Sequence, residues 1–291
     1  MRGFPRVVRS PEHVDSAVGV DELLSGNTAA RKRRARNRRR AAGHRPRQGF
    51  FRTLVQGLGE LLITAGVILL LFVVWELWWT NIDANNAQQQ ALTQFADKFQ
   101  GPTAPVAAPG SPPRNYGAPP VMAEVNAPGT VFGVVYVPRF GRNYSRPLVE
   151  GTAMEQLNTL GLGHYEASAM PGGVGNFAVA GHRQTHGAVL DAIDTLVPGD
   201  RIYVQTNDGY YTYVFRNNQI VLPDRVDVLL PVPTRPDAKP TERFLTMTSC
   251  NPRFGSSERI IAYSVMDAWQ PTSAGPPAAI AGQVAANKSK G

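Results

Sequence analysis

The chain has 291 residues, a formal net charge of +8 and a single cysteine. The basicity is local, because eleven Lys or Arg and no Asp or Glu lie between Arg31 and Arg52, which leaves the rest of the chain slightly acidic. This distribution argues against a basic fold that binds nucleic acid, and one cysteine excludes an internal disulfide.

The first predicted element is a membrane-spanning helix over residues 58–79, LGELLITAGVILLLFVVWELWW. Such a run is long enough to cross the hydrocarbon core of a bilayer, and its tryptophans gather at the C-terminal end as an interfacial aromatic belt would. By the positive-inside rule, the basic block before it predicts that residues 1–57 form a cytoplasmic, disordered segment. Everything after Thr80 is then expected outside the cell membrane, in a single-pass protein.

Two other interpretations of these segments are weaker. The basic block resembles arms that bind nucleic acid, but beside a spanning helix it is better explained as setting orientation. The apolar run resembles a cleaved signal peptide, yet it begins late in the chain and no small-residue cleavage site follows it. We therefore expect a retained membrane anchor and no nucleic-acid partner.

Two segments around the exported domain are predicted to lack a core. Residues 80–128 are expected to form an extracytoplasmic linker, in which the helix continues for a few polar turns. Residues 101–128 are rich in Pro, Ala and Gly, a composition typical of a semi-rigid spacer. Residues 271–291 are an Ala-, Gly- and Pro-rich tail that is expected to be flexible. The folded domain is thus assigned to residues 129–270.

Residues 129–270 have the pattern of short strands with few helices. Residues 201–222 form a predicted hairpin around Asn207-Asp208-Gly209, because Asp-Gly suits a tight turn. Many short strands with few helices indicate a mainly β domain, either a compact barrel or a sandwich. The other predicted strands are 131–138, 176–182, 243–250 and 259–269, and the predicted helices are 152–160 and 189–196.

Cys250 is the one residue that can act as a thiol nucleophile. It closes a predicted strand before Asn251-Pro252, which puts its side chain at the rim of a sheet, where sites are often built. Histidine is the usual base beside a thiol, and His182, in AGHR, also follows an apolar strand. His164 and His186 belong to the same exported domain, and spacing alone does not choose among the three.

Topology excludes two further histidines, His13 and His44, because it puts them across the membrane from Cys250. Arg259 begins the strand after Cys250, so a hairpin-like return would bring its guanidinium beside the thiol, where it can stabilise an oxyanion. A surface pairing of Arg259 with Glu258 or a neighbouring carboxylate, and an inert, buried Cys250, stay open as alternatives. There is no CxxC, HExxH, P-loop or GxSxG pattern, so no metal and no other cofactor is expected.

The exported segments resemble the sortase family, and within it the class E housekeeping branch of actinobacteria. The resemblance extends over roughly residues 55–270, including the membrane segment that ends in ELWWTN. The chain departs from the family pattern at two places. TMTSC stands where TLTTC is common, which is a mild change, and His186 stands where the family often has a tyrosine, which concerns the pocket wall and no catalytic role. The similar stretches are VPRFGRNYSRPLVEG (137–151), GLGHYEASAMPGGVGNFAVAGHR (161–183), LVPGDRIYV (196–204) and TMTSCNPRFGSSERIIAYS (246–264).

The resemblance implies a closed eight-stranded β-barrel, preceded by a single transmembrane helix, with the site in a groove at the strand ends. It implies a cysteine transpeptidase whose catalytic residues are His182, Cys250 and Arg259, and in which Tyr144 contacts the substrate. Cys250 would cleave the Thr–Gly bond of an LAxTG- or LPxTG-like signal at the C-terminal end of secreted proteins. The resulting thioester would be resolved by an amine of the cell-wall precursor lipid II or of peptidoglycan.

Two alternatives to this function are weighed. Within the family, a pilus-building sortase would use a lysine of a pilin as the acceptor, although the chain has no obvious N-terminal lid motif. From a different class, a wall-binding module would carry Cys250 as a purely structural residue. Acceptor preference and the reactivity of the thiol separate these readings.

Overall fold

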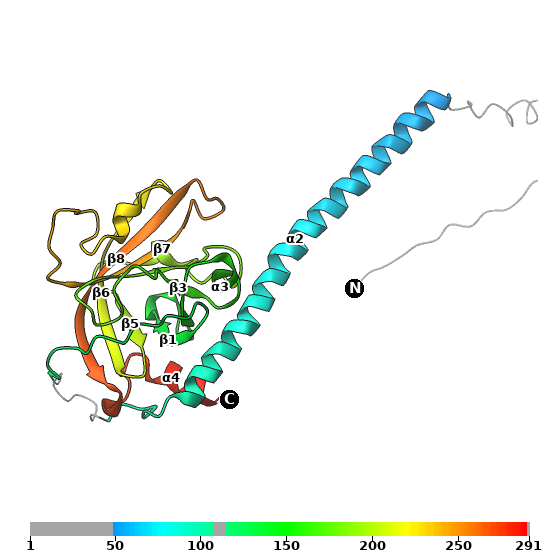
Figure 1. Ribbon diagram of the computed structural model, residues 1–291. Coiled ribbons are helices and arrows are strands. Elements are labelled where there is room, and N and C mark those ends of the chain that lie inside the picture. Colours follow the sequence, from blue (N-terminus) through cyan, green and yellow to red (C-terminus); the bar gives the residue numbers. More distant parts are fainter. Residues whose placement is uncertain (1–48, 107–114, 290–291) are drawn as a thin grey trace, which may run out of the picture. The chain divides into compact units, whose positions relative to one another are not determined.

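The computed structural model describes residues 49–106 and 115–289, and its contacts divide the chain into two units, 1–68 and 69–291. Helix α2 (Phe50–Lys98) contains the predicted span and is longer at both ends (Figure 1). Its apolar stretch is long enough to cross a membrane. Most of the predicted disordered segment, residues 1–48, lies outside the described residues, and its last part is helical from Phe50 onward.

A closed barrel of eight strands follows α2 in the chain, with the order β1-β2-β3-β4-β7-β8-β6-β5. The β2–β3 and β4–β7 pairs are parallel, and the other neighbours are antiparallel. The closed barrel that the resemblance implies is thereby confirmed. The strands are β1 (Val131–Tyr136), β2 (Ser145–Glu150), β3 (Leu162–His164), β4 (Gly175–Ala180), β5 (Arg201–Gln205), β6 (Gly209–Val221), β7 (Arg243–Asn251) and β8 (Glu258–Pro271).

The barrel interior is packed with apolar side chains, such as Leu148, Phe177 and Ile202, which are fully buried in one cluster. Strands β2 and β3 are absent from the sequence prediction. Strand β2 contains Pro147, which is disfavoured inside a sheet, and β3 has only three residues. The remaining elements are α3 (Met154–Thr159), α4 (Ala281–Ser289) and the 3-10 turns η1 (Pro138–Phe140), η2 (Ile193–Thr195), η3 (Val226–Leu229) and η4 (Thr272–Ala274).

The predicted helix over residues 189–196 is wrong, because η2 is the only helical turn described there. The segment forms successive tight turns in which Ile193 N–H donates to the Leu190 carbonyl and Thr195 N–H donates to the Ala192 carbonyl. Leu190 and Ile193 are both fully buried. Their separation of three residues matches the repeat of a 3-10 turn, which brings both onto the barrel core.

Residues 80–98, assigned to the linker, are instead the C-terminal part of α2 and pack on the barrel. Leu92 and Phe95 are buried in one cluster with Val134 and Tyr210 of the barrel. Phe99, just past the helix, meets the Tyr210 ring edge-on with centroids 6.1 Å apart. The helix continues as expected, but the expected lack of a core is wrong for this part of the chain, because its sparse apolar residues fall on one helix face and pack on the barrel.

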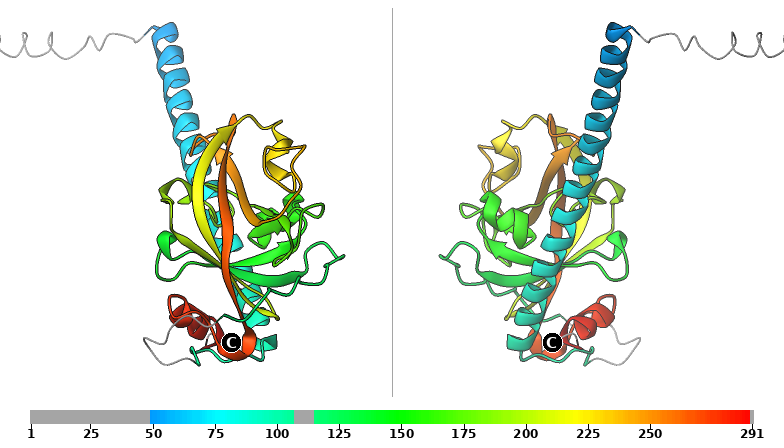
Figure 2. Two further views of the ribbon diagram at one scale, coloured as in Figure 1. Left: turned by 90° about the vertical axis from the view of Figure 1, so that its left-hand side faces the viewer. Right: turned by 90° about the vertical axis from the view of Figure 1, so that its right-hand side faces the viewer.

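The predicted flexible tail, residues 271–291, is also ordered where the structure describes it. Helix α4 packs beside the C-terminal end of α2, as both views in Figure 2 show, and Ile280 and Val284 are buried in the same cluster as Phe95. Asn287 on α4 is buried too and donates to the Tyr136 hydroxyl at 3.4 Å. The C-terminal part of α2 and helix α4 therefore pack together against one side of the barrel.

The Pro-rich segment before β1 lies along the barrel rather than apart from it. The backbone N–H of Met122 donates to the Pro171 carbonyl, the Tyr211 hydroxyl donates to the Pro120 carbonyl at 3.2 Å, and Trp269 Nε1 donates to Gly117 at 2.9 Å. Residues 115–128 are therefore an attached strap. Residues 107–114 of the predicted linker lie outside the described residues.

Candidate active site

The register of three strands brings the sequence-predicted catalytic residues to one end of the barrel. Ala180 of β4 pairs with Thr248 of β7, so that His182 and Cys250 each follow two residues beyond this matched pair. Cys250 is in turn the direct antiparallel partner of Arg259 on β8. Side chains of directly paired residues lie on the same face of a sheet. The hairpin-like return expected from the sequence is therefore the one observed.

Cys250 is partly exposed, which contradicts the alternative of a deeply buried thiol. Its strand neighbour Ser249 is buried and donates through Oγ to the Gly181 carbonyl at 2.8 Å. This hydrogen bond fastens the end of β7 to the backbone just before His182. The two segments that carry the thiol and the imidazole are thus held together directly, independently of any bound substrate.

Arg183 fixes the same strand ends from the other side. Its side chain is 3% exposed, and Nη1 donates to Asn251 Oδ1 at 2.6 Å and to the Cys250 carbonyl at 3.4 Å. The other end of the guanidinium pairs with Asp194 at 2.9 Å. A buried arginine with charge-assisted hydrogen bonds holds its partners in a fixed geometry. Arg183 therefore positions the residues on both sides of the site.

His182 has a specific orienting partner. Its Nε2–H donates to Oδ1 of Asn158 on α3 at 2.7 Å, and its ring lies 4.9 Å from the ring of His186. Burial, with a smaller contribution from His186, lowers the pKa of His182 below its ordinary value. A thiol, a histidine and an amide that orients the histidine form a recurrent arrangement for nucleophilic catalysis.

Arg259 does not form the surface pair with Glu258 that was the alternative to a role at the site. Its Nη1 donates to the carbonyls of Ser256 and Glu258 at 2.9 and 2.8 Å. The Glu258 carboxylate instead accepts from Asn251 Nδ2 at 2.6 Å. The backbone thus holds the guanidinium at the start of β8, beside Cys250, where it can stabilise negative charge on a substrate oxygen.

Of the three candidate histidines, His164, His182 and His186, the first belongs to the barrel interior. It lies on β3, and its side chain is 2% exposed. Nδ1 contacts the Glu150 carboxylate at 2.9 Å, and Nε2 contacts Ser168 Oγ at 2.9 Å. Its ring nitrogens are therefore engaged with Glu150 and Ser168. His182 is the histidine that follows the last β4–β7 pair at the same two-residue distance as Cys250.

Tyr144 supports the loop that follows His182. Its hydroxyl donates to the Val189 carbonyl at 2.7 Å, and burial raises the pKa of this hydroxyl above its ordinary value. Phe140 packs edge-on against the ring at 5.0 Å, and the Arg146 guanidinium lies 5.4 Å from the ring centroid. The hydroxyl is thus engaged with the protein itself, and any contact with substrate would come from the ring.

Sequence reasoning did not assign roles to Asn158 and Arg183. Arg183 lies inside the AGHR stretch that marked His182, so its proximity in sequence was a usable signal. Asn158 lies 24 residues before its histidine, and no spacing rule connects the two. Within the described part of the chain, no group of three His, Cys, Asp or Glu is arranged to hold a metal ion.

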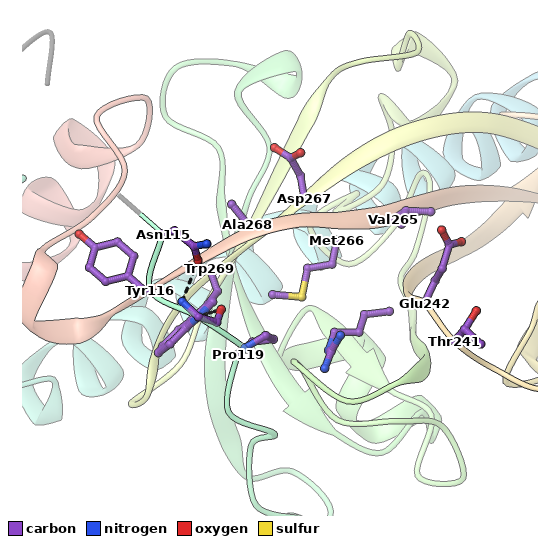
Figure 3. A pocket seen from close by; sticks show the side chains of 12 residues that line it. Asn115, Tyr116, Pro119, Thr241, Glu242, Val265, Met266, Asp267, Ala268 and Trp269 are labelled. Carbon is purple, nitrogen blue, oxygen red and sulfur yellow. Dashed lines mark hydrogen bonds between the residues drawn. The ribbon is translucent and has the colours of Figure 1, made fainter. Parts of the chain in front are cut away.

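A separate pocket of about 540 Å³ lies at the other end of the β7–β8 pair. Figure 3 shows Tyr116 and Trp269 toward one end of this pocket and Thr241 and Glu242 toward the other. The strap residues 115–119 form one wall, and Trp269 hydrogen-bonds into the strap at Gly117. The pocket is thus a feature of strap docking and is remote along both strands from Cys250.

Comparisons with known proteins point to one family. Residues 135–267 match the family model described as the sortase domain. Sortase SrtE1 of Streptomyces coelicolor is 34% identical over 254 residues, which are 85% of this chain and 66%, just under two thirds, of the relative. Sortase SrtE2 of the same organism is 34% identical over 219 residues, 72% of this chain and 80% of the relative. The solved SrtA sortase from Actinomyces oris superposes with a TM-score of 0.54 at 37% identity, over 57% of this chain and 94% of that chain.

Proposed function

The chain belongs to the sortase family of cysteine transpeptidases, and on that premise we propose that Cys250, His182 and Arg259 carry the reaction. The proposed substrates are secreted proteins with a C-terminal LAxTG- or LPxTG-like signal, cleaved between Thr and Gly. The observation that carries this proposal is the strand register, in which Cys250 pairs with Arg259 and lies two residues past the β4–β7 pairing that precedes His182.

In the first half of the reaction, the Cys250 thiolate attacks the threonine carbonyl carbon. The carbonyl oxygen becomes an oxyanion, which the Arg259 guanidinium stabilises through N–H donors. The C–N bond to glycine then breaks as protonated His182 gives its proton to the leaving amine. The products are a thioester on Cys250 and a free N-terminal glycine fragment, with His182 neutral.

In the second half, an acceptor amine attacks the thioester carbonyl. Neutral His182 takes the proton from that amine, the C–S bond breaks, and the thiolate of Cys250 is regenerated. Asn158 supports both halves because its Oδ1 holds one ring nitrogen of His182 at 2.7 Å and fixes the orientation of the ring. The proposed acceptor is an amine of lipid II or of peptidoglycan.

The path of α2 supports an acceptor at the membrane surface. Trp78 and Trp79 are exposed, as residues of an interfacial belt would be, and the basic block at the opposite end of the apolar run favours a cytoplasmic N-terminus. Asn81 contacts the loop after His182 through Gly187 at 2.8 Å. At about 1.5 Å per residue, Asn81 is only about 3 Å beyond Trp79 along the helix.

The test uses the full chain in detergent micelles and peptides that carry LAxTG- and LPxTG-like signals. We expect cleavage at the Thr–Gly bond, transfer to lipid II or to a peptidoglycan-derived amine, and loss of both in Cys250→Ala. Absence of cleavage across varied signals, or turnover retained by Cys250→Ala, would contradict the proposal. Faster transfer to a pilin lysine than to the wall-derived amines would favour the pilus-building alternative.

A further inference from the structure

A turn with unusual backbone geometry follows His182. Three consecutive residues, His186, Gly187 and Ala188, have φ angles of 52°, 87° and 47°. Residues other than glycine rarely adopt this left-handed conformation, because their Cβ comes too close to the backbone. Such strain persists where neighbouring structure over-determines it, and it concentrates at functional sites. The contacts that hold this turn therefore indicate what the site requires.

Two amide side chains of α2 hold the turn from one side. Oδ1 of Asn81 accepts the Gly187 N–H at 2.8 Å, and its Nδ2 donates to the Gln184 carbonyl at 3.4 Å. Gln88 is fully buried, and its Nε2 donates to the His186 carbonyl at 3.2 Å. A Cβ added at Gly187 would lie 2.8 Å from Gln88 Nε2, so the helix and the turn are in close contact.

The same face of α2 is built for this contact. Asn81 and Gln88 are seven residues apart, which is close to two helical turns and puts them on one side of the helix. Ala84 and Ala91 lie on that side and are buried, with 2% and 5% of their surface exposed. Small residues at these positions let the helix backbone approach the loop closely enough for both amides to reach it.

The turn connects directly to the proposed catalytic histidine. The His186 ring lies 4.9 Å from the His182 ring, and the Leu190 N–H donates to the His182 carbonyl at 2.9 Å. The far side of the turn is held by Arg146, whose Nη2 donates to the Gly187 carbonyl at 3.2 Å. A displacement of the turn would therefore move both the ring packed on His182 and the hydrogen bond to its backbone.

We propose that Asn81 and Gln88 are positioning residues, which act through the turn at residues 186–188 to hold His182 in its working orientation beside Cys250. The extension of the membrane anchor is then an integral part of the active site. The inference rests on the proposed role of His182. It predicts that damage to the turn slows the chemical step and leaves substrate binding nearly unchanged.

The test compares Asn81→Ala and Gln88→Ala with matched controls on the exposed side of the same helix, Asn86→Ala and Gln90→Ala. In the full chain, we expect kcat for peptide cleavage to fall about 10- to 100-fold in the first pair, because small misplacements of catalytic groups have effects of this size. KM and the melting temperature should change little. Both control variants should match the wild type.

Asn81→Asp makes the test specific to the hydrogen bond. It keeps an oxygen acceptor for the Gly187 N–H, but it loses the donation to the Gln184 carbonyl and adds a carboxylate charge. The kcat should therefore fall between the values for wild type and Asn81→Ala. This variant also decides the case if Asn81→Ala fails to fold. A kcat within twofold of wild type in both Asn81→Ala and Gln88→Ala, or equal losses in the controls, would overturn the proposal.

A second measurement does not depend on turnover. NMR titration of labelled histidines in the full chain should give a pKa for His182 below its ordinary value in the wild type, since burial and His186 both lower it. In Asn81→Ala and Gln88→Ala this pKa should rise. An unchanged titration of His182 overturns the positioning role, whereas a wild type that makes no thioester but shows the expected titrations overturns only the proposed function.

Discussion

The strand ends of the barrel could be predicted from their sequence, whereas the structural role of the helices that flank the barrel could not. Cys250 and His182 follow short apolar runs that the sequence already predicts as strands, Arg259 begins another, and the register pairs Cys250 with Arg259 directly. The flanking helices, residues 80–98 of α2 and all of α4, come from Gln- and Ala-rich stretches that read as linker and tail. Yet they bury Phe95 and Val284 in one cluster. Segments of low apolar content can therefore be structural parts of a catalytic unit.

The largest expected effect is a loss of stability from a substitution in the C-terminal part of α2. Phe95→Ala removes a side chain that is 7% exposed and packed on Val134 and Tyr210. Deleting a buried phenylalanine typically costs about 3–5 kcal/mol of unfolding free energy. We expect a loss of this order in the full chain by chemical denaturation. Phe254→Ala, at an 85% exposed position, should change stability by less than about 0.5 kcal/mol.

If Phe95→Ala were as mild as Phe254→Ala, α2 would be a tether without a structural role in the barrel. The barrel would then fold without help from α2, and the helix would serve only to attach it. A large loss would instead mean that a soluble fragment starting near residue 128 lacks part of its core. Fragments for enzymology should accordingly begin before Thr80.

A smaller effect is expected at the strand ends, and it concerns rate rather than stability. Arg259→Ala should lower kcat by about 10²- to 10³-fold, the usual result of removing an oxyanion donor. Arg259→Lys should recover only part of the rate, because an ammonium does not reproduce the planar fork of guanidinium donors. Stopped-flow or discontinuous peptide cleavage measures both. A wild-type rate in Arg259→Ala would remove Arg259 from the mechanism.

The smallest effect is a pH dependence of stability. The pKa of His182 is lowered in the folded chain, so the unfolded chain binds more protons in the window between that lowered pKa and about 6.5. Unfolding free energy should therefore rise with pH through this window. His182→Gln should flatten the rise in a comparison of denaturation curves at closely spaced pH values. An equally steep rise in His182→Gln would assign the dependence to other groups.

Much of the site could be predicted from local sequence, and the rest depends on contacts between distant segments. Cys250 and His182 were identifiable because each closes an apolar strand, and Arg259 because a short return brings it back. The bond from Asn158 to His182 and the bond from Asn81 to Gly187 span 24 and 106 residues. Only the folded chain brings such residues together, and no local pattern encodes their pairing.

The same distinction applies to the fold. Strands β4 to β8 follow apolar or alternating runs of sequence. Strand β2 contains a proline, and its pairing with β1 and β3, rather than its own sequence, identifies it as a strand. In residues 80–99 the apolar positions 92, 95 and 99 repeat at helical spacing. The many glutamines and alanines of this segment make the repeat difficult to recognise from composition. Periodicity was therefore the better guide there than average polarity.

The most direct test of the central claim is the intact mass of the full chain after rapid mixing with a signal peptide. We expect an adduct on Cys250 with the mass of the peptide portion that ends in threonine, and we expect this adduct to disappear when an acceptor amine is added. The adduct should be absent from Cys250→Ala and accumulate slowly in His182→Ala. A chain that cleaves the peptide without any adduct on Cys250, or that carries the adduct elsewhere, would contradict the account.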